Sequence, residues 1–564
     1  MNRQKSHFSN YFLWKNKRIY KAKNHTVSNL MGGGGGFNRE LKILILFLGL
    51  ISFSNLIFSN NTFASYTPTL SASVDQTNLQ VNGNSVINST NKTTEIPLNL
   101  TVNTNNKTGY TATLSSETEN TALINATSTA GAKINSISSA GPLGGFSNNT
   151  WGYKFGASSN YAPIPALSTP AQILQTTGKT NGDESSQLSI GMKLSDNLES
   201  GNYTNKLILS FVSNPYTPIA IMTEGPDFNA KLKALETATN KIEHFKKSST
   251  PPATTTNAKN IEDEESDYEI KLWLDPTDKT AYYYAEPEKA YLNADSSQMF
   301  RASLFKGRYR PYIKSLDLSS FNTSKVTDMH DMFFGMSDLT TLDLSNFDTS
   351  NVMDMSSMFS NLYDLAMLNL SSFDTSKVTD MHDMFSSTSY RLTTLDLSSF
   401  DTSKVTNMAG MFKWIYALTT LDLSHFDTSN VTNMREMFKS MSNLTALNLS
   451  NFNTSKVTDM RDMFFNMPRL TTLDLSNFDT SKVTDMNSMF AIFADSPDDK
   501  LEKIYVNNDF DTTKLTSFRG VFSDRKKLRG GNGSYLANPT AADKTWLRID
   551  DPVHGRPGYF TRKP

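Results

Sequence analysis

Residues 339–364 read LTTLDLSNFDTSNVMDMSSMFSNLYD, and close variants of this stretch fill most of the second half of the chain. The Leu-x-Leu triplet inside it recurs every 26 residues, with a single spacing of 27. Its seven copies begin at Leu316, Leu342, Leu368, Leu395, Leu421, Leu447 and Leu473. Self-similarity at a period of this size indicates repeats that stack on one another and share a core.

The hydrophobic period changes within each repeat. Leu342 and Leu344 alternate with Asp343, which predicts a short strand with both leucines inward and the acid outward. Apolar residues then return at spacings of three, three and one, which favours a short helix. These residues are Val352, Met355, Met358 and Phe359. Thr349 or Ser350 is placed to accept hydrogen bonds from the first amides of that helix.

Pattern and composition divide the chain into six segments. The predicted boundaries are 1–64 for an export signal or N-terminal anchor, 65–213 for a β-sandwich-like domain, 214–265 for a helix-containing linker, 266–300 for an N-terminal cap, 301–522 for the repeats and 523–564 for a C-terminal cap or tail. The caps are expected because open repeat ends would expose leucines and strand edges. A hairpin over 268–284, turning at 275–278, is the expected first cap.

Residues 65–213 have the pattern of an all-β domain. Apolar and polar side chains alternate over 96–102, 110–114, 188–192 and 207–211. Period two gives a strand one buried and one wet face, as in a β-sandwich. In the linker, apolar residues at helical spacing predict a short amphipathic helix. They are Phe228, Leu232, Leu235, Ile242 and Phe245.

The first 64 residues indicate export. Residues 1–40 hold eight Lys or Arg and one acid, an apolar run follows from Leu41 to Phe58, and small residues occupy 62–65. This order is typical of a signal peptide, here cleaved after Ala64. An uncleaved anchor stays open as the alternative, because about 18 apolar residues reach the lower limit of a membrane span. The start site, Met1 or Met31, is also open.

Composition excludes several classes of chemistry. The chain has no cysteine, which removes disulfides, thiolate metal sites and cysteine nucleophiles. Its 54 basic and 55 acidic residues nearly balance, so the overall charge does not favour nucleic acid. No phosphate-binding loop, nucleophile elbow or His-Glu zinc motif is present in the sequence. We therefore expect no enzyme activity, no cofactor, no nucleic-acid partner, and membrane contact only through an uncleaved N-terminal segment.

At the repeat itself the chain resembles a known family. The pattern LDLSNFDTSNV followed by paired methionines and Phe is similar to the 26-residue repeat of BspA-like leucine-rich-repeat surface proteins of bacteria. Residues 291–297 and 557–560 resemble that family's flanking segments. The family often has cysteine where this chain has Met336, Met441 and Met467, so a thiol role is absent.

The resemblance implies both a fold and a role. The expected fold is multidomain: an N-terminal all-β sandwich-like domain, then a right-handed α/β leucine-rich-repeat-like solenoid with a short strand and a helical turn in each coil. The implied role is an exposed protein that adheres to host cells, extracellular matrix or other microbes.

Two columns of side chains in the repeats invite a metal interpretation, and neither supports one. The methionines at helical spacing, such as Met329 and Met332, are expected in the core. His330 and His382 occupy the same repeat position two units apart, too far to share one zinc ion. No metal site is predicted.

The candidate binding stripe is the outward column beside the leucines. It comprises Asp317, Asp343, Asn369, Asp396, Asp422, Asn448 and Asp474, with Thr341, Thr394, Thr420 and Thr472 beside them. One interpretation is hydration or a hydrogen bond to flanking Ser or Thr. The other is a surface that binds a cationic patch, divalent cations, or a protein or glycan on another cell or in the matrix.

These patterns together predict a secreted or cell-surface, adhesin-like binding protein that acts outside the cell. The alternative is a structural scaffold of the cell envelope without an external ligand. A column of lysines at Lys325, Lys377, Lys404, Lys456 and Lys482 is expected to be a solvated face that balances Asp328, Asp354 and Asp380.

Overall fold

The computed structural model describes residues 38–47, 67–305, 308–310, 313–388, 390–494, 496 and 499–564. Within this part the chain divides into two compact units, with the boundary along the chain between Tyr216 and Thr217. In neither unit does a described helix combine the length and apolarity that crossing a bilayer requires.

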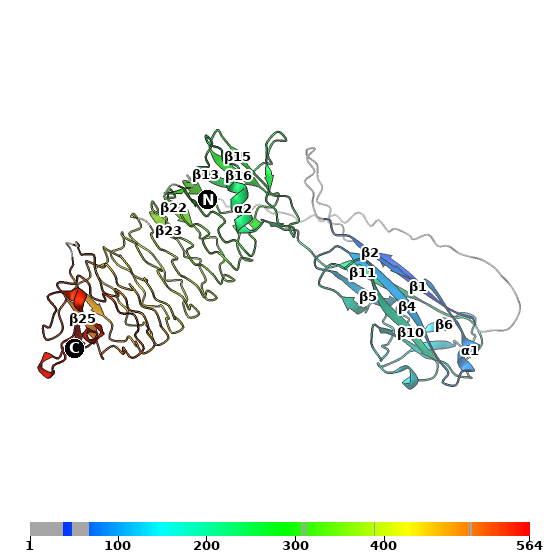
Figure 1. The fold of residues 1–564 in the computed structure, drawn as a ribbon. Helices are drawn as coiled ribbons and strands as arrows, with labels where there is room; N and C mark the ends of the chain where they lie inside the picture. The colour runs from blue at the N-terminus through cyan, green and yellow to red at the C-terminus, as the bar shows by residue number, and fades with distance from the viewer. Residues whose placement is uncertain are drawn as a thin grey trace, which may run out of the picture. The chain divides into compact units, whose positions relative to one another are not determined.

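The N-terminal unit is built almost entirely of strands (Figure 1). They are β1 (Asn38–Phe47), β2 (Leu70–Val74), β3 (Asn78–Asn82), β4 (Thr93–Thr104), β5 (Tyr110–Ser116), β6 (Leu123–Asn125), β7 (Lys133–Ser136), β8 (Thr150–Phe155), β9 (Ala171–Gln175), β10 (Glu184–Lys193) and β11 (Tyr203–Ser213), with a short helix α1 (Gly83–Ile87) and a 3-10 turn η1 (Leu143–Gly145). The hydrogen-bonded order is β2-β4-β10-β8-β7-β6-β11-β1-β3, with β5 joining β11 to β9.

The alternating segments of the sequence fall in these strands. Residues 96–102 lie in β4 and 188–192 in β10, and the two strands pair antiparallel with Leu98 opposite Leu188. Both leucines are fully buried, as is Trp151, whose indole N–H donates to the carbonyl of Thr121 at 2.9 Å. A buried ring with its one polar atom satisfied anchors this core.

The predicted export segment overlaps the first strand. Residues 41–47 lie in β1, which pairs in parallel with β11 and antiparallel with β3. The rest of the predicted apolar run, 48–58, and the expected cleavage site at Ala64 lie outside the described residues.

The second unit begins with small sheets and one helix. Its elements are β12 (Ala220–Ile221), α2 (Gly225–Lys233), β13 (His244–Lys247), β14 (Lys259–Asn260), β15 (Lys271–Asp275), β16 (Thr280–Tyr284), β17 (Ala290–Tyr291), β18 (Ser303–Phe305), β19 (Arg308–Arg310), β20 (Ser315–Leu316), β21 (Phe321–Asn322), β22 (Thr341–Asp343), β23 (Met367–Asn369), β24 (Thr472–Asp474), β25 (Lys503–Val506) and β26 (Phe560–Arg562), with 3-10 turns η2 (Pro539–Ala541), η3 (Lys544–Trp546) and η4 (Pro552–His554).

The expected hairpin before the repeats is present as β15 and β16. The two strands pair antiparallel, and β13 joins β16 to β20, the first strand of the repeats. The amphipathic helix of the linker is α2, which buries Phe228 and Leu232. Phe245, expected on the same helix, lies instead in β13, where its ring packs edge-on against Phe228 and Phe300.

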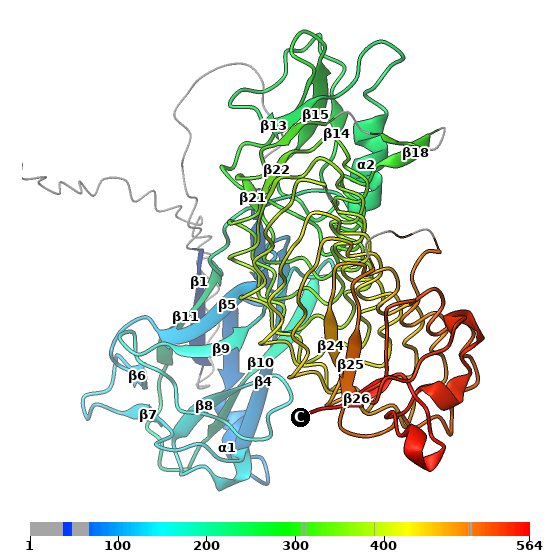
Figure 2. The same ribbon diagram turned by 90° about the vertical axis from the view of Figure 1, so that its left-hand side faces the viewer.

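The predicted right-handed α/β leucine-rich-repeat-like solenoid with one helical turn per coil is wrong. Both α-helices of the described residues, α1 and α2, precede the repeats. The segment expected to be helical, 352–359, forms turns, and its Asp354 makes parallel bridges to Asp328 and Asp380. The short strands of the repeats also fall into separate small sheets, β22-β23 and β24-β25-β26, and form no continuous sheet. Figure 2 shows the last three side by side.

Hydrogen bonding between units explains why no helix forms. The amides of Met355, Ser357 and Phe359 donate to carbonyls of the next unit at 2.8–3.1 Å, whereas an α-helix needs each amide for its own turn. Ser357 and Asn361 have left-handed backbones, with φ of 54° and 62°. Helices about 10 Å wide could not stack at the spacing of about 4.8 Å that paired backbones require.

Threonine therefore does not cap a helix. The buried hydroxyl of Thr349 donates to the carbonyl of Asp374 in the next unit at 2.9 Å and accepts from the amide of the same residue at 2.9 Å. The same reciprocal pair joins Thr428 to Asn453. Each such hydroxyl satisfies two backbone groups that the missing strand pairing leaves available.

The core of the repeats is one continuous column of apolar side chains. Leu342, Leu344 and the paired methionines are buried, as the sequence predicts, while Asp343 is exposed. One phenylalanine of each unit stacks on that of the next with ring centroids 5.4–6.0 Å apart. This phenylalanine ladder comprises Phe300, Phe333, Phe359, Phe385, Phe412, Phe438, Phe464, Phe490 and Phe522. The apolar side chains of each repeat are thereby buried in the core, and the columns of side chains that point outward are polar.

Candidate functional site

The binding stripe lies on the outside of the repeats, one residue per unit. Asp317, Asp343, Asp396, Asp422 and Asn448 are exposed. Asn369 and Asp474 are half-buried, and the neighbouring Thr341, Thr394, Thr420 and Thr472 are all exposed. The structure thus places every predicted stripe residue on the surface of the repeats.

Each side chain of the stripe is held by the same local turn. The Oδ1 atom accepts a hydrogen bond from the backbone amide two residues on, at 2.9–3.2 Å. This arrangement is the Asx turn that Asp and Asn favour, and it fixes the orientation of the carboxylate or amide. The stripe is therefore an ordered array of similar groups.

The same hydrogen bonds favour the charged form of three acids of the stripe. The backbone amide of Ser345 lowers the pKa of Asp343, and the amides of Ser398 and Ser424 do the same for the pKa values of Asp396 and Asp422. A hydrogen bond to the ionised form favours it. These carboxylates are therefore ionised throughout the physiological pH range.

The stripe changes character at its C-terminal end. Lys563 lies 2.7 Å from Oδ2 of Asp474, so C-terminal residues of the chain cover this position of the stripe. Each position of the stripe is called a rung below. Asn369 donates to Asp343 at 3.2 Å, which relieves like-charge repulsion between adjacent units. The open part of the stripe therefore runs from Asp317 to Asn448.

A second polar column, which the sequence analysis did not treat as a site, follows the parallel bridges between units. It comprises Asp295, Asp328, Asp354, Asp380, Asn407, Asn433, Asp459, Asp485 and Ser517. Asp328 and Asp380 each accept a hydrogen bond from a histidine Nδ1 at 2.8 Å, from His330 and His382 respectively. The backbone positions of these acids are fixed by the bridges themselves.

Three side chains in and beside this column lie close enough together to bind one metal ion. One ligand atom of each of Asp328, His330 and Asp354 lies within 4.8 Å of the others. Carboxylates and a neutral imidazole are suitable ligands for several divalent cations. Sequence reasoning compared His330 only with His382 and missed the acids of its own and the next unit.

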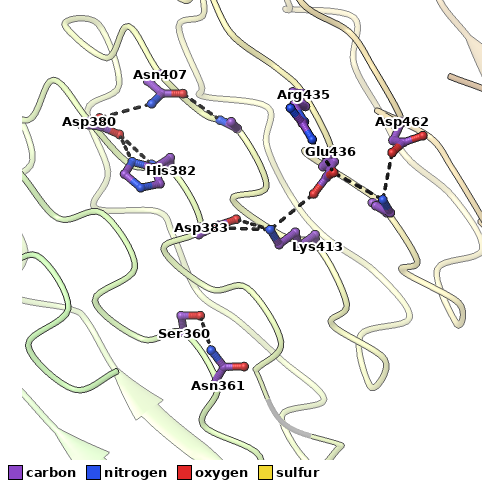
Figure 3. Close-up of polar contacts among 12 residues, drawn as sticks. Ser360, Asn361, Asp380, His382, Asp383, Asn407, Lys413, Arg435, Glu436 and Asp462 are labelled. Atoms are coloured by element: carbon purple, nitrogen blue, oxygen red, sulfur yellow. Dashed lines mark hydrogen bonds and ion pairs between the residues drawn. The ribbon is translucent and has the colours of Figure 1, made fainter. Parts of the chain in front are cut away.

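An ion-pair network continues this polar surface toward the C-terminus (Figure 3). Lys413 lies 2.9 Å from Asp383 and 3.4 Å from Glu436, and Lys439 bridges Glu436 at 3.4 Å to Asp462 at 2.9 Å. Burial alone would raise the pKa of Glu436, but the surrounding cations outweigh it and hold the pKa below its usual value.

Glycine makes one of these contacts possible. Gly410 has φ +61°, and a Cβ there would lie 2.0 Å from Oδ1 of Asp383. A larger residue would displace the carboxylate from Lys413. A shallow pocket lies at this place, lined by residues that include His382, Lys413 and Glu436. The signal in the sequence was the presence of Lys413 and Lys439 at one position of two adjacent units, a departure that a comparison of all seven units obscures.

Two lysines of the predicted lysine column donate hydrogen bonds to asparagines, whereas the column was expected to be a solvated face. Lys377 donates to Asn351 at 2.6 Å, and Lys456 donates to Asn430 at 2.6 Å. The asparagines that interrupt the column are therefore the hydrogen-bond partners of the lysines one unit later.

Comparison with known proteins identifies the repeats and no activity. Residues 297–420, 388–504 and 413–534 each match the family model described as Mycoplasma protein of unknown function, DUF285. The three matches overlap and together span the repeats from residue 297 to 534. No curated protein matches the chain.

Proposed function

We propose that this chain is a secreted or cell-surface binding protein of the adhesin type, whose repeats present one long polar face to a protein or glycan on host cells, matrix or other microbes. The resemblance of its repeat to BspA-like leucine-rich-repeat surface proteins and the export-like N-terminus support this proposal. The partner would meet the molecule outside the cell.

One observation carries the proposal: the stripe repeats the same oriented group from unit to unit. Exposed, ionised carboxylates in identical turns form a preorganised array, which reduces the ordering cost of binding. A ligand read by many rungs gains affinity from several weak contacts rather than from one. Stacking of the repeats does not require a negative charge at this position, because the neutral Asn369 and Asn448 form the same turn.

The decisive experiment uses the purified chain with fluorescent labelling. We expect it to bind foreign cells or immobilised matrix in a saturable manner, and we expect the triple variant Asp343→Asn, Asp396→Asn, Asp422→Asn to bind about tenfold or more weakly, since steering by charge is lost. A single substitution should weaken binding less than about threefold, because the other rungs remain.

A matched control comes from another acid column of the same three units. Asp348, Asp401 and Asp427 are exposed, and the equivalent position is Asn453 in a later unit. The triple Asp→Asn variant at these positions has the same change in charge and should bind normally. Binding only to the envelope of the producing cell would favour the scaffold instead, and equal loss in both triple variants would remove the stripe from the proposal.

A further inference from the structure

A small pocket on the repeats gathers aromatic side chains that the repeat does not need. It is lined by Asn361, Tyr363, Ser387, Thr388, Tyr390, Trp414 and Tyr416. In the described part of the chain, three of the five exposed aromatic side chains belong to this aromatic pocket, and Tyr390 is 68% exposed. Exposed aromatic surface gathered in one place marks a binding site more often than a structural need.

The neighbouring units supply an internal control. The position of the three tyrosines is Ser337, Ser442 or Pro468 in other units, and all of these units fold alike. The position of Trp414 is Gly335, Asn361, Ser387, Ser440 or Asn466 in five other units and Ile492 in the unit that begins at Leu473. Stacking of the units therefore does not require an aromatic residue at either place.

Trp414 also has an unfavourable backbone for its size. Its φ is +60°, a left-handed conformation that this column otherwise gives to small or polar residues: Gly335, Asn361, Ser387, Ser440, Asn466 and Asp524. Bulky residues rarely adopt this conformation because Cβ approaches the carbonyl oxygen. Strain held by its surroundings is a recurrent feature of binding sites. The indole is thus placed on the surface at a cost in free energy.

The pocket combines flat rings with neutral polar groups. Tyr390 and Tyr416 stack with centroids 5.4 Å apart and planes within 5°. At the edge, the hydroxyl of Tyr363 donates to Oδ1 of Asn361 at 2.9 Å, whereas the hydroxyl of Thr388 is buried and donates to the backbone carbonyls of Phe359 and Phe385. None of the lining residues carries a charge, which favours a neutral ligand with hydrogen-bonding groups around an apolar face.

A cationic ligand fits less well. Lys413 already lies 5.2 Å from the centre of the Trp414 ring, so one face of the best cation-binding ring is occupied by a positive charge. Quaternary ammonium groups also prefer rings arranged as a cage, whereas Tyr390 and Tyr416 are stacked on each other.

We propose that the aromatic pocket binds a neutral pyranose unit of a glycan. The C–H groups on one face of a pyranose pack on the electron-rich faces of aromatic rings, while its hydroxyls reach the amide and hydroxyl groups at the rim. This inference rests on the proposed function and gives it a ligand class and a second, more local site beside the stripe. Stacking supplies affinity, and the polar rim supplies selectivity.

The test applies the full chain to an array of immobilised neutral oligosaccharides that end in glucose, galactose, mannose or N-acetylhexosamines. We expect binding to at least one of them, with a change in intrinsic tryptophan fluorescence on titration. Trp414→Asn and Tyr390→Ser, which copy residues of other units, should each weaken that binding by about tenfold, since a lost stacking contact is worth this much. Tyr535→Ser, an exposed aromatic outside the pocket, should bind normally.

Three results would overturn the inference: no neutral glycan is bound, phosphocholine is bound instead, or Trp414→Asn binds the glycan as the unsubstituted chain does. Thermal unfolding of both pocket variants verifies folding, and Trp414→Asn should be at least as stable as the unsubstituted chain. Whole-cell binding separates this inference from the proposed function. If the chain binds no glycan on the array, but both pocket variants still bind cells, the glycan inference is wrong and the proposed function stands. If the unsubstituted chain does not bind cells, the proposed function itself is wrong.

Discussion

The N-terminal unit and the repeats bury apolar side chains in different ways. In the first, strands far apart in sequence pair, so that β4 meets β10 and β5 meets β11. In the described part of the repeats, each unit bonds to the units before and after it, through the same backbone and threonine contacts each time. The first arrangement must form as a whole, whereas the second adds stability unit by unit. Damage should therefore spread through the first and stay local in the second.

The largest test of this difference is Trp151→Ala in the N-terminal core. Loss of a fully buried indole should cost about 3–5 kcal/mol of unfolding free energy in that unit. Scanning calorimetry of the full chain should show one transition at a lower temperature and the transition of the repeats unchanged. Trp151→Phe, which keeps a ring, should shift the first transition less. Equal shifts in both transitions would mean that the units unfold together.

A change of intermediate size is Thr428→Val in the middle of the repeats. The valine keeps the shape but leaves the amide and carbonyl of Asn453 without the hydroxyl, at about 1–2 kcal/mol. Hydrogen exchange should then increase at the junction of these two units and not in the N-terminal sheet. Thr432→Val is a suitable control, because Thr432 is exposed and its hydroxyl donates to one carbonyl, that of Thr406 at 3.2 Å, where water can replace it. Uniform faster exchange throughout the repeats would contradict local damage.

The smallest effect concerns the histidine units and pH. The hydrogen bond to Asp380 raises the pKa of His382, against the opposing effect of burial. A raised folded pKa gives stability that is fully present below the unfolded pKa of about 6.5 and is lost as pH rises through the folded value. Relative to His382→Ser, the chain should be more stable at pH 5.5 than at pH 8.5, by less than about 1 kcal/mol because the pair is partly exposed. Urea midpoints measure this, and a midpoint difference that does not depend on pH would refute it.

Sequence could predict which side chains face inward but not the local backbone. Leu342 and Leu344 follow the alternation of a strand, and the buried methionines follow from their regular return. The spacing that favoured a helix is equally satisfied by a turned segment whose alternate amides bond to the next unit. A signal against the helix was present, since the left-handed position of Ser357, inside the expected helix, is Gly410 and Gly520 in two other units.

The candidate site likewise has a part that the sequence could predict and a part that it could not. The stripe was predictable because Asp343 and its equivalents repeat, and repetition is what pattern analysis detects. The aromatic pocket was missed because Tyr363, Tyr390 and Trp414 depart from the repeat. The ion pair of Lys413 with Asp383 was missed for a further reason: it joins two units, and only the register between them brings the charges together.

The phenylalanine ladder has a consequence for how such a chain changes over generations. Every step of the ladder has nearly the same ring spacing, 5.4–6.0 Å, so each unit offers its successor an equivalent docking surface. Duplication or excision of one whole period in the gene would lengthen or shorten the molecule by one ladder step without inventing a new contact. Reach is therefore an adjustable trait of this architecture, free to vary while its interior chemistry stays constant.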